Sequence, residues 1–381
     1  MAWTDFTLTV TTPVFNDHDS GDLRLSSLRG ALRFWFRALI GHRVGNDAQA
    51  LAKAEEHVFG STKRPSPVRM RLAHQPESTP AGPGFLAGGD SAGIAYLAGM
   101  GLASGRRLTR RYIAPGREQT ARLKVAFSGH KDVDVLFLGS LWLLCAYGGV
   151  GARTRRGFGG LRLDHEQGPL PDPWTPETVA PPTLDHYQGL QHVAPTTVQS
   201  LCAPFIHALL PENTAENGQA PGYPVLGEAY TLAGCSRRTF TTWRRAAHTT
   251  GERFQTFRTS TGDYNTVVKA ERRPGKPYPV GALGLPVQYR GGDQVNAEKR
   301  QPDGRWEKAR RASPLWLRFV SDEEQTTWRV FCFAFHNRFL PLDSHKIWLR
   351  SNNDDDTPVR VTDEHVRERT AAWIRSTLPS L

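Results

Sequence analysis

The 381-residue sequence is poor in cysteine, with only Cys145, Cys202, Cys235 and Cys332, and no two of them form a CxxC or CxxxC pair. A framework of disulfides and a structural zinc site are therefore both unexpected. Cys145 lies in an apolar stretch that predicts a helix, and Cys332 lies in one that predicts a strand. Both are ordinary core positions for a thiol.

Long apolar runs and a leader segment are also missing. The first ten residues, MAWTDFTLTV, have neither the basic start nor the apolar block of a signal peptide. No apolar run approaches the ~20 residues that a membrane-spanning helix needs. We therefore expect a cytoplasmic protein with reduced thiols and no membrane partner.

A nucleotide-binding loop is absent, although residues 148–160 read GGVGARTRRGFGG. No lysine follows these glycines as a P-loop requires, and Thr154 stands where the third glycine of a GxGxxG fingerprint would be. The apolar run before the loop (133–147) predicts a helix, and LRL (161–163) after it predicts a strand. This order of elements is the reverse of both nucleotide motifs.

The composition of this glycine-rich loop, residues 148–160, is typical of polyanion contact. It holds six glycines and three arginines without a carboxylate. Glycine lets a backbone approach a bulky ligand, and the planar guanidinium of arginine matches phosphate. The alternative is a long flexible turn with solvated arginines. The loop residues predicted to contact a polyanion are Gly149, Gly151, Arg153, Arg155, Arg156, Gly157 and Phe158.

Acidic residues are scarce in the first half of the chain. The formal net charge is +11 and the sequence pI is about 9.7. Residues 1–165 hold 22 Lys and Arg against 13 Asp and Glu, whereas the rest holds 26 against 24. Arginine outnumbers lysine 18 to 4 in residues 1–165. This distribution favours a nucleic-acid partner for the first half.

One predicted helix carries an unusual row of arginines. RLSSLRGALRFWFRAL (24–39) repeats arginine every four residues at Arg29, Arg33 and Arg37, which places them on one face. Residues 24–46 contain no Asp or Glu, so pairing within the helix is excluded and an outside phosphate is favoured over a solvated face with distant carboxylates. Ser26 or Ser27 is expected to cap the helix, which would end near residue 41. Arg24, Ser27 and Gly30 complete the predicted contact set.

The order of elements predicts a fold. Strands are expected at 4–10, 66–72, 122–128 and 161–165, with helices at about 26–41 and 135–147, which is the β-α-β-β-α-β order of a ferredoxin-like domain. A further short helix is expected at 48–58, and residues 75–118 are expected to be a long insertion. Six prolines in 166–184 indicate a linker. The predicted domains are therefore 1–165 and 185–381.

The second half contains a short segment that is similar in sequence to one in the first half. PSPVRMRL (65–72) is similar to ASPLWLRF (312–319) in its Ser-Pro, its alternation and its late arginine. We also expect a helix around 227–247, a strand at 328–335, a final helix at 362–377, and loops at 251–279 and 291–311. The prediction is an α+β protein with two tandem ferredoxin-like (RRM-like, RAMP) domains and long loop insertions.

These residues carry a resemblance to a known family. RLSSLRGALRFWFRAL, followed by AEEHVFGS (54–61) and SPVRMRL (66–72), resembles the opening of the first-numbered Cmr subunit of type III-B CRISPR effectors. The loop at 148–160 is similar to the glycine-rich loop of the RAMP superfamily, and LGLP (283–286) with RRASPLWLRF (310–319) resembles a later segment of the same subunit.

The resemblance implies a function. It implies a non-catalytic RNA-binding subunit that caps the effector filament near the 3′ part of the guide (CRISPR) RNA. There it would hold the guide–target RNA duplex beside other RAMP subunits of the Cmr complex. By position, Arg24, Arg29, Arg33, Arg37 and the loop arginines would face RNA.

No catalytic residue, metal or cofactor is predicted. His42 is the best candidate for a general base, but a lone histidine at a helix end more commonly complements the helix dipole. The run Asp354–Asp356 reads as a solvated loop and not as a metal site. Two alternatives stay open: a metal-independent guide-RNA-processing endoribonuclease of the RAMP superfamily, and an assembly adaptor whose basic face docks on an acidic neighbour.

Overall fold

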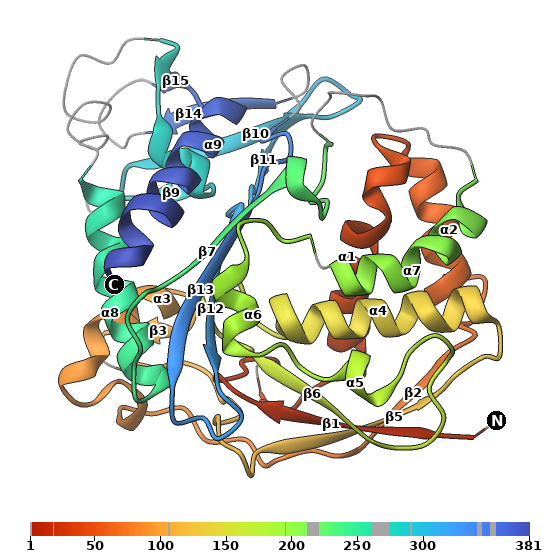
Figure 1. Cartoon of the computed structure of the whole chain (residues 1–381). Helices are drawn as coiled ribbons and strands as arrows, with labels where there is room; N and C mark the ends of the chain where they lie inside the picture. Colours follow the sequence, from red (N-terminus) through yellow and green to blue (C-terminus); the bar gives the residue numbers. More distant parts are fainter. Residues whose placement is uncertain are drawn as a thin grey trace.

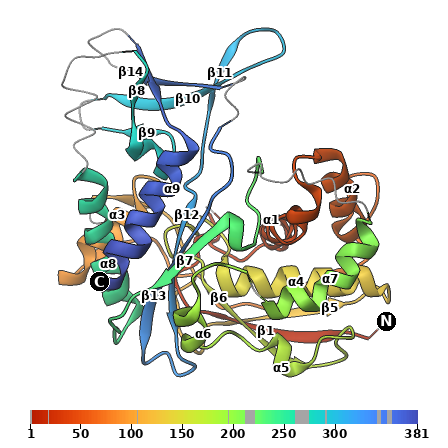
Figure 2. The ribbon, with the colours of Figure 1, turned by 45° about the horizontal axis from the view of Figure 1, so that its top comes forward.

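The computed structural model contains three main β-sheets and three hydrophobic cores, and one face of the middle sheet packs into the same core as the N-terminal sheet (Figures 1 and 2). Two of these sheets belong to ferredoxin-like units, and the third is an insertion in the second unit. The structure describes residues 2–17, 19–105, 107–194, 196–211, 221–260, 274–289, 292–340, 345–350 and 356–381.

The N-terminal sheet has four antiparallel strands in the order β2-β5-β1-β6. Alternation along β1 sends Phe6, Leu8 and Val10 into the core, and α1 and α4 cover this face. This is the predicted ferredoxin-like order, and the prediction is confirmed. The strands are β1 (Thr4–Val10), β2 (Arg69–His74), β5 (Thr120–Ala126) and β6 (Leu161–Gln167), and the helices are α1 (Leu25–Val44), α2 (Ala48–Phe59) and α4 (Lys131–Tyr147).

The arginine helix α1 begins earlier and ends later than predicted. Arg24 occupies its N-cap position in an extended conformation, and no side chain caps the helix. Ser26 and Ser27 therefore lie inside the first turn, so the expected serine cap is wrong. The helix continues to Val44, where Gly45 ends it.

The proline-rich segment is not a free linker. It contains α5 (Pro176–Val179), and Trp174 and Val179 are buried in the N-terminal core. Helix α7 (Thr196–Leu209), which was assigned to the second domain, packs against α4 (Figure 2). The reason is that α4 is apolar on all sides and needs a second cover. The short helix α6 (Leu184–Gly189) lies between α5 and α7 in sequence.

The C-terminal ferredoxin-like unit has three antiparallel strands in the order β12-β13-β7 and lacks a fourth within the described residues. The strand predicted at 328–335 is confirmed, whereas the helix predicted at 227–247 is wrong, because α8 begins only at Trp243. The elements are β7 (Thr231–Cys235), α8 (Trp243–Thr259), β12 (Leu315–Ser321), β13 (Trp328–Phe335) and α9 (Asp363–Ala371), which continues as a π-helical turn (Ala372–Thr377).

The two similar segments, 65–72 and 312–319, lie at equivalent strands of the two units. PSPVRMRL leads into β2 and ASPLWLRF into β12, and each is the second strand of its unit and lies at a sheet edge. Two tandem ferredoxin-like domains are therefore confirmed, with a degenerate second copy.

A third sheet occupies much of the region predicted as loops. Its strand order is β11-β10-β14-β15-β8, and β9 pairs with β10. The prediction of a loop at 291–311 is wrong, because β10 and β11 form a hairpin. Its strand pattern is hidden by the polar residues of β10, some of which are buried, and by the exposed residues of β11. The strands are β8 (Lys276–Pro277), β9 (Val287–Gln288), β10 (Gln294–Arg300), β11 (Trp306–Ala309), β14 (His345–Arg350) and β15 (Thr357–Arg360).

The insertion at 75–118 holds α3 (Ala92–Ala98), β3 (Ala103–Ser104) and β4 (Arg107–Leu108). Its apolar residues belong to the C-terminal core, where α3 packs on α8 (Figure 1). The first half of the chain therefore contributes to the core of the second. Short 3-10 helices cover Gly84–Leu86, Gly89–Ser91, Glu228–Tyr230, Pro279–Leu283 and Leu378–Ser380.

The cysteines lie mostly in the interior. All four cysteines are free thiols, and Cys145, Cys202 and Cys332 are buried. Among the helices that the structure describes, none combines the length and apolarity needed to cross a membrane.

Candidate RNA interface

The glycine-rich loop lies between the two ferredoxin-like units. The Leu317 N–H on β12 donates to the Arg155 carbonyl at 3.2 Å, and Arg156 forms a parallel bridge with Leu317. A Cβ at Gly157 would lie 2.2 Å from the Phe319 ring. The second half of the loop is thus an extension of the C-terminal sheet edge.

Two of the three loop arginines face the C-terminal unit. Arg155 donates to the Ser313 carbonyl at 2.6 Å and lies 5.0 Å from the Trp316 ring centre, and Arg156 lies 4.5 Å from that of Phe254. Burial lowers the pKa of Arg155 to about 10 and that of Arg156 to about 9, so both stay charged at neutral pH. Their cation–π contacts join the two units. The prediction that all three loop arginines are free to contact a polyanion is therefore wrong for Arg155 and Arg156.

Phe158 and two of the glycines also have packing roles. Phe158 is 1% exposed and meets Phe15 edge to face, with ring centres 5.5 Å apart. A buried ring cannot stack on a base, so the predicted RNA contact of Phe158 is wrong in this structure. Gly149 faces the backbone of Gly159, where a Cβ would lie 2.6 Å from the carbonyl oxygen. Gly149, like Gly157, is a site of tight packing.

The tip of the loop differs from the rest because it faces solvent. Gly151 and Arg153 are exposed, and both have a positive φ, of 94° and 63°. The Arg153 guanidinium lies beside Gly99 of the insertion, where a Cβ would be 2.9 Å from its Nη2. Burial and the charge of Arg110 both lower the pKa of Arg153. The tip therefore concentrates positive charge.

The segment before α1 connects the loop tip to the start of that helix. Gly151 abuts Phe15, since a Cβ there would lie 2.4 Å from the Phe15 carbonyl oxygen. The Asn16 side-chain amide donates to the Asp22 carbonyl at 2.7 Å, and Asp17 pairs with Arg24 at 2.6 Å. The loop tip and the N-terminus of α1 thus lie side by side, although they are more than 120 residues apart in sequence.

One stripe of α1, with Gly30 exposed and Ser27 and Phe34 half-buried, runs toward the loop. Ser27, Gly30 and Phe34 follow one another at helical spacing, and Arg155 lies 5.9 Å from the Phe34 ring centre. A Cβ at Gly30 would meet nothing within 4 Å, so the surface there is open. Arg29 is half-buried, and its Nε has no hydrogen-bond partner in the described structure. The structure therefore brings Arg24, Ser27 and Gly30 beside the loop tip, and Arg29 lies in the same first turns of α1 but on its arginine face.

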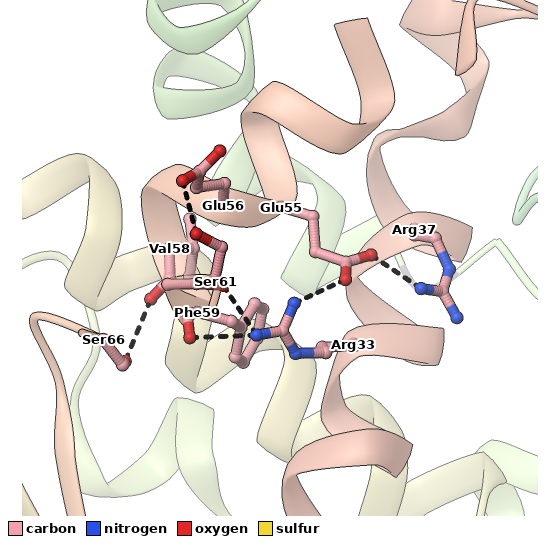
Figure 3. Close-up of polar contacts among 9 residues, drawn as sticks. Arg33, Arg37, Glu55, Glu56, Val58, Phe59, Ser61 and Ser66 are labelled. Atoms are coloured by element: carbon pink, nitrogen blue, oxygen red, sulfur yellow. Dashed lines mark hydrogen bonds and ion pairs between the residues drawn. The ribbon is translucent and has the colours of Figure 1, made fainter. Parts of the chain in front are cut away.

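Arg33 and Arg37 have a partner that the sequence pattern hid (Figure 3). Glu55 on α2 pairs through one oxygen with Arg33 and through the other with Arg37, each at 2.6 Å. Arg33 also donates to the carbonyls of Phe59 and Gly60 at the end of α2, at 3.1 and 2.7 Å. The absence of acids in 24–46 excludes a partner on the same helix only. The inference that these two arginines need an outside anion is wrong.

Replacing Glu55 with glutamine tests this pairing. The substitution keeps the shape of the side chain but removes the charge that two arginines share. Because all three groups are partly exposed, we expect a loss of only about 1 kcal/mol in the free energy of unfolding. The measurement is chemical denaturation. Glu56→Gln is the matched control, since the Glu56 carboxylate accepts from the exposed Ser61 hydroxyl and pairs with no described arginine. An equal loss in both variants would contradict the pairing.

The candidate catalytic residues have ordinary surroundings. His42 is exposed, and its Nδ1 lies 2.9 Å from the Leu39 carbonyl of the same helix. Asp354 and Asp355 lie outside the described residues, and Asp356 pairs with Arg350. No group of three His, Cys, Asp or Glu in the described ranges could hold a metal ion.

The family of the N-terminal unit follows from comparison with known proteins. The family model of the RAMP superfamily matches residues 7–162, which span β1 to β6 and include the glycine-rich loop. These residues form a RAMP domain. The match ends inside β6, so the superfamily assignment rests on the first ferredoxin-like unit.

Two relatives that match part of this chain come from Pyrococcus furiosus. The CRISPR system Cmr subunit Cmr1-1 is 35% identical over 144 residues, or 37% of this chain and 40% of the relative. The subunit Cmr1-2 is 28% identical over 174 residues, or 42% of this chain and 93% of the relative. The matched segment thus spans less than half the length of Cmr1-1.

The fold similarity extends beyond the RAMP domain. The crystal structure of Cmr1 from Pyrococcus furiosus in its apo form superposes with a TM-score of 0.61 at 21% identity, covering 100% of this chain and 98% of that chain. The whole chain therefore has the Cmr1 fold, including the degenerate C-terminal unit.

Sequence reasoning missed Asn16, Asp17 and Arg110 at the interface. No motif contains them, and they take part only because the segment before α1 and the insertion lie against the loop tip. The available indication was the Asn- and Asp-rich stretch directly before the arginine helix.

Proposed function

We propose that this chain is a non-catalytic RNA-binding subunit of a type III-B CRISPR (Cmr) complex. The observation that carries the proposal is the joint surface of the loop tip and the first turns of α1. It presents Arg24, Arg29 and Arg153, which come from distant parts of the sequence. The similarity to subunits named Cmr1 supports membership of such a complex.

The N-terminus of α1 adds backbone donors and positive potential to this surface, and both favour the binding of phosphate. No side chain caps the helix, so the first-turn N–H groups remain available, and the helix dipole adds positive potential there. Ser26 and Ser27 lie in the same turn and offer hydroxyl donors. Binding through phosphates predicts weak sequence preference and a strong dependence on salt.

Fewer arginines are available to bind RNA than the sequence pattern predicts. Arg33 and Arg37 are held by Glu55, and Arg155 and Arg156 by the C-terminal unit. The RNA track we propose therefore runs from the loop tip along Ser27 and Gly30. We further propose that the RNA is the guide strand near its 3′ part, paired with target RNA, beside other RAMP subunits in the cytoplasm.

A triple substitution tests the proposed track. In Arg24→Ala/Arg29→Ala/Arg153→Ala, we expect affinity for a 20-nucleotide RNA to fall roughly tenfold or more at 0.1 M salt. The slope of log affinity against log salt should fall by about 2, since each phosphate contact on a single strand contributes ~0.7. Fluorescence anisotropy at several salt concentrations measures both.

The control is Arg33→Ala/Arg37→Ala, which removes charge from the same helix face. We expect it to change RNA affinity less than the triple variant does. If the order were reversed, the proposed track would be wrong. Metal-independent cleavage of repeat RNA that disappears in His42→Ala would instead identify an endoribonuclease, and incorporation into a complex without RNA would identify an adaptor.

A further inference from the structure

The N-terminal sheet has a second face that neither the core nor the proposed RNA track uses. Helices α1 and α4 lie on one side, and Figure 1 shows the other side at the lower boundary of the molecule. Strand alternation places Arg69 and Arg71 of β2 on this open face, together with Arg122 and Lys124 of β5. The three arginines are exposed.

The pairing register sets like charges against each other on this face. Arg71 lies directly opposite Lys124, and His74 lies opposite Arg122. Directly opposed like charges destabilise an antiparallel pair. The sheet therefore tolerates a local repulsion that a bound anion would relieve.

Carboxylates on the neighbouring strands do little to offset this charge. Strands β2 and β5 contain none, and β1 contains only Asp5. Asp5 is 3% exposed and is already engaged by Lys124 at 3.1 Å and by Gln167 at 3.2 Å. The exposed guanidinium groups of Arg71 and Arg122 have no ion pair with any described carboxylate.

Strand β6 limits the patch on its other side. Arg162 pairs with Asp164 at 3.2 Å and approaches Glu323 at 3.4 Å. Charge there is balanced within the protein. The unbalanced area is therefore centred on β2 and β5, at the free edge of the sheet.

We propose that the open face of β2 and β5 is a second surface for the RNA backbone, on the side of the RAMP domain opposite α1. Two-residue spacing sets successive guanidinium groups of one strand ~6.7 Å apart, in a row that can follow a chain of phosphates. The row does not depend on the loop tip or on the proposed guide-RNA track.

The chemistry of the face favours RNA over an acidic protein. Protein interfaces have an apolar centre, but the exposed residues of β2 and β5 are basic or small: Arg69, Arg71, Ala73, His74 and Arg122. A large apolar side chain exposed near these strands is Trp3, which is 41% exposed just before β1. A ring beside basic strands suits stacking on an unpaired base.

The test counts RNA sites on the full chain. We titrate a fluorescein-labelled 10-nucleotide RNA at concentrations above its dissociation constant and expect two molecules bound per wild-type chain. Arg71→Ala/Arg122→Ala should bind one, and so should the triple variant of the α1 track. The matched control is Arg245→Ala/Arg253→Ala, which removes two exposed arginines from α8 and should still bind two.

The outcomes separate this proposal from the proposed function. One RNA per wild-type chain, with no change in Arg71→Ala/Arg122→Ala, would overturn the second surface and leave the α1 track intact. Unchanged RNA binding together with weakened binding of poly-glutamate would assign the face to an acidic protein and also overturn it. Because both arginines are exposed and Arg71 faces the like charge of Lys124, the variant should not lower the unfolding midpoint, which thermal unfolding checks.

Discussion

Replacing Arg318 with methionine is expected to lower the free energy of unfolding by about 2–4 kcal/mol, because two buried carbonyl groups lose their donor. Arg318 lies on β12 and is only 5% exposed. It donates to the carbonyls of Cys145, at 2.8 Å, and Gly148, at the end of α4. Methionine keeps an unbranched apolar stem but has no donor, so the substitution removes both hydrogen bonds together with the buried charge.

The position of Arg318 explains why the effect should be large. The end of α4 carries the negative end of a helix dipole and is buried beside the glycine-rich loop. Burial lowers the pKa of Arg318, because a buried charge loses its hydration, and this is the cost of holding the charge there. The arginine offsets that cost by joining the RAMP domain to the C-terminal sheet. Removing it leaves both carbonyls without their donor.

A neighbouring arginine provides the control. Arg329 on β13 donates to the carbonyls of Ser236 and Arg237, but these groups are close to solvent and belong to the same unit. Arg329→Met should therefore cost less than half as much. Differential scanning calorimetry and urea denaturation measure both variants. Equal losses, or a loss under 1 kcal/mol for Arg318→Met, would contradict the role of a buried link between the units.

Much of the fold could be predicted because strand alternation is a local property. Phe6, Leu8 and Val10 mark β1 by alternation, whereas runs of apolar residues that are buried on both faces mark β12 and β13 in the second unit. Helix α3 escaped prediction because AGIAYLA is short and lies in a Gly- and Pro-rich region. Its helical state depends on packing against α8, which no local pattern records.

The interface was harder to predict than the fold. The prediction that the arginines of α1 share one helix face was correct, but the partners of these arginines depend on how α2 packs against α1. Glu55 and Glu56 are adjacent in sequence, and only the docking angle decides that Glu55 meets Arg33 and Arg37. The same holds for Phe158, whose burial follows from the C-terminal unit covering the loop. Composition cannot distinguish an arginine that binds RNA from one that joins two domains.

Replacing Gly93 with alanine is expected to destabilise the protein by about 3 kcal/mol, near the upper end of the usual cost of overpacking. Gly93 on α3 meets Gly251 on α8 where the two helices cross. A Cβ at Gly93 would lie 1.9 Å from the His248 carbonyl oxygen, and one at Gly251 would lie 2.0 Å from that of Gly93. Both obstacles are backbone atoms, so rotating a side chain cannot relieve the clash.

Gly30→Ala is the matched control, because it makes the same chemical change inside another helix. A Cβ at Gly30 would meet nothing within 4 Å. Helix propensity alone then predicts a gain of ~1 kcal/mol. The two substitutions should therefore shift the unfolding midpoint in opposite directions. A stabilising or neutral Gly93→Ala would show that α3 does not pack on α8 at this distance.

The consequence of Gly93→Ala should reach the proposed RNA interface. Helix α3 ends at Ala98, and Arg153 of the loop tip rests against the next residue, Gly99. Moving α3 away from α8 would remove the support of Arg153 without changing any RNA-binding side chain. We therefore expect a protease to cleave the Gly93→Ala variant faster within residues 75–118 in limited proteolysis. We also expect the variant to bind RNA more weakly. Faster cleavage with unchanged RNA affinity would separate the insertion from the loop tip and confine its role to the C-terminal core.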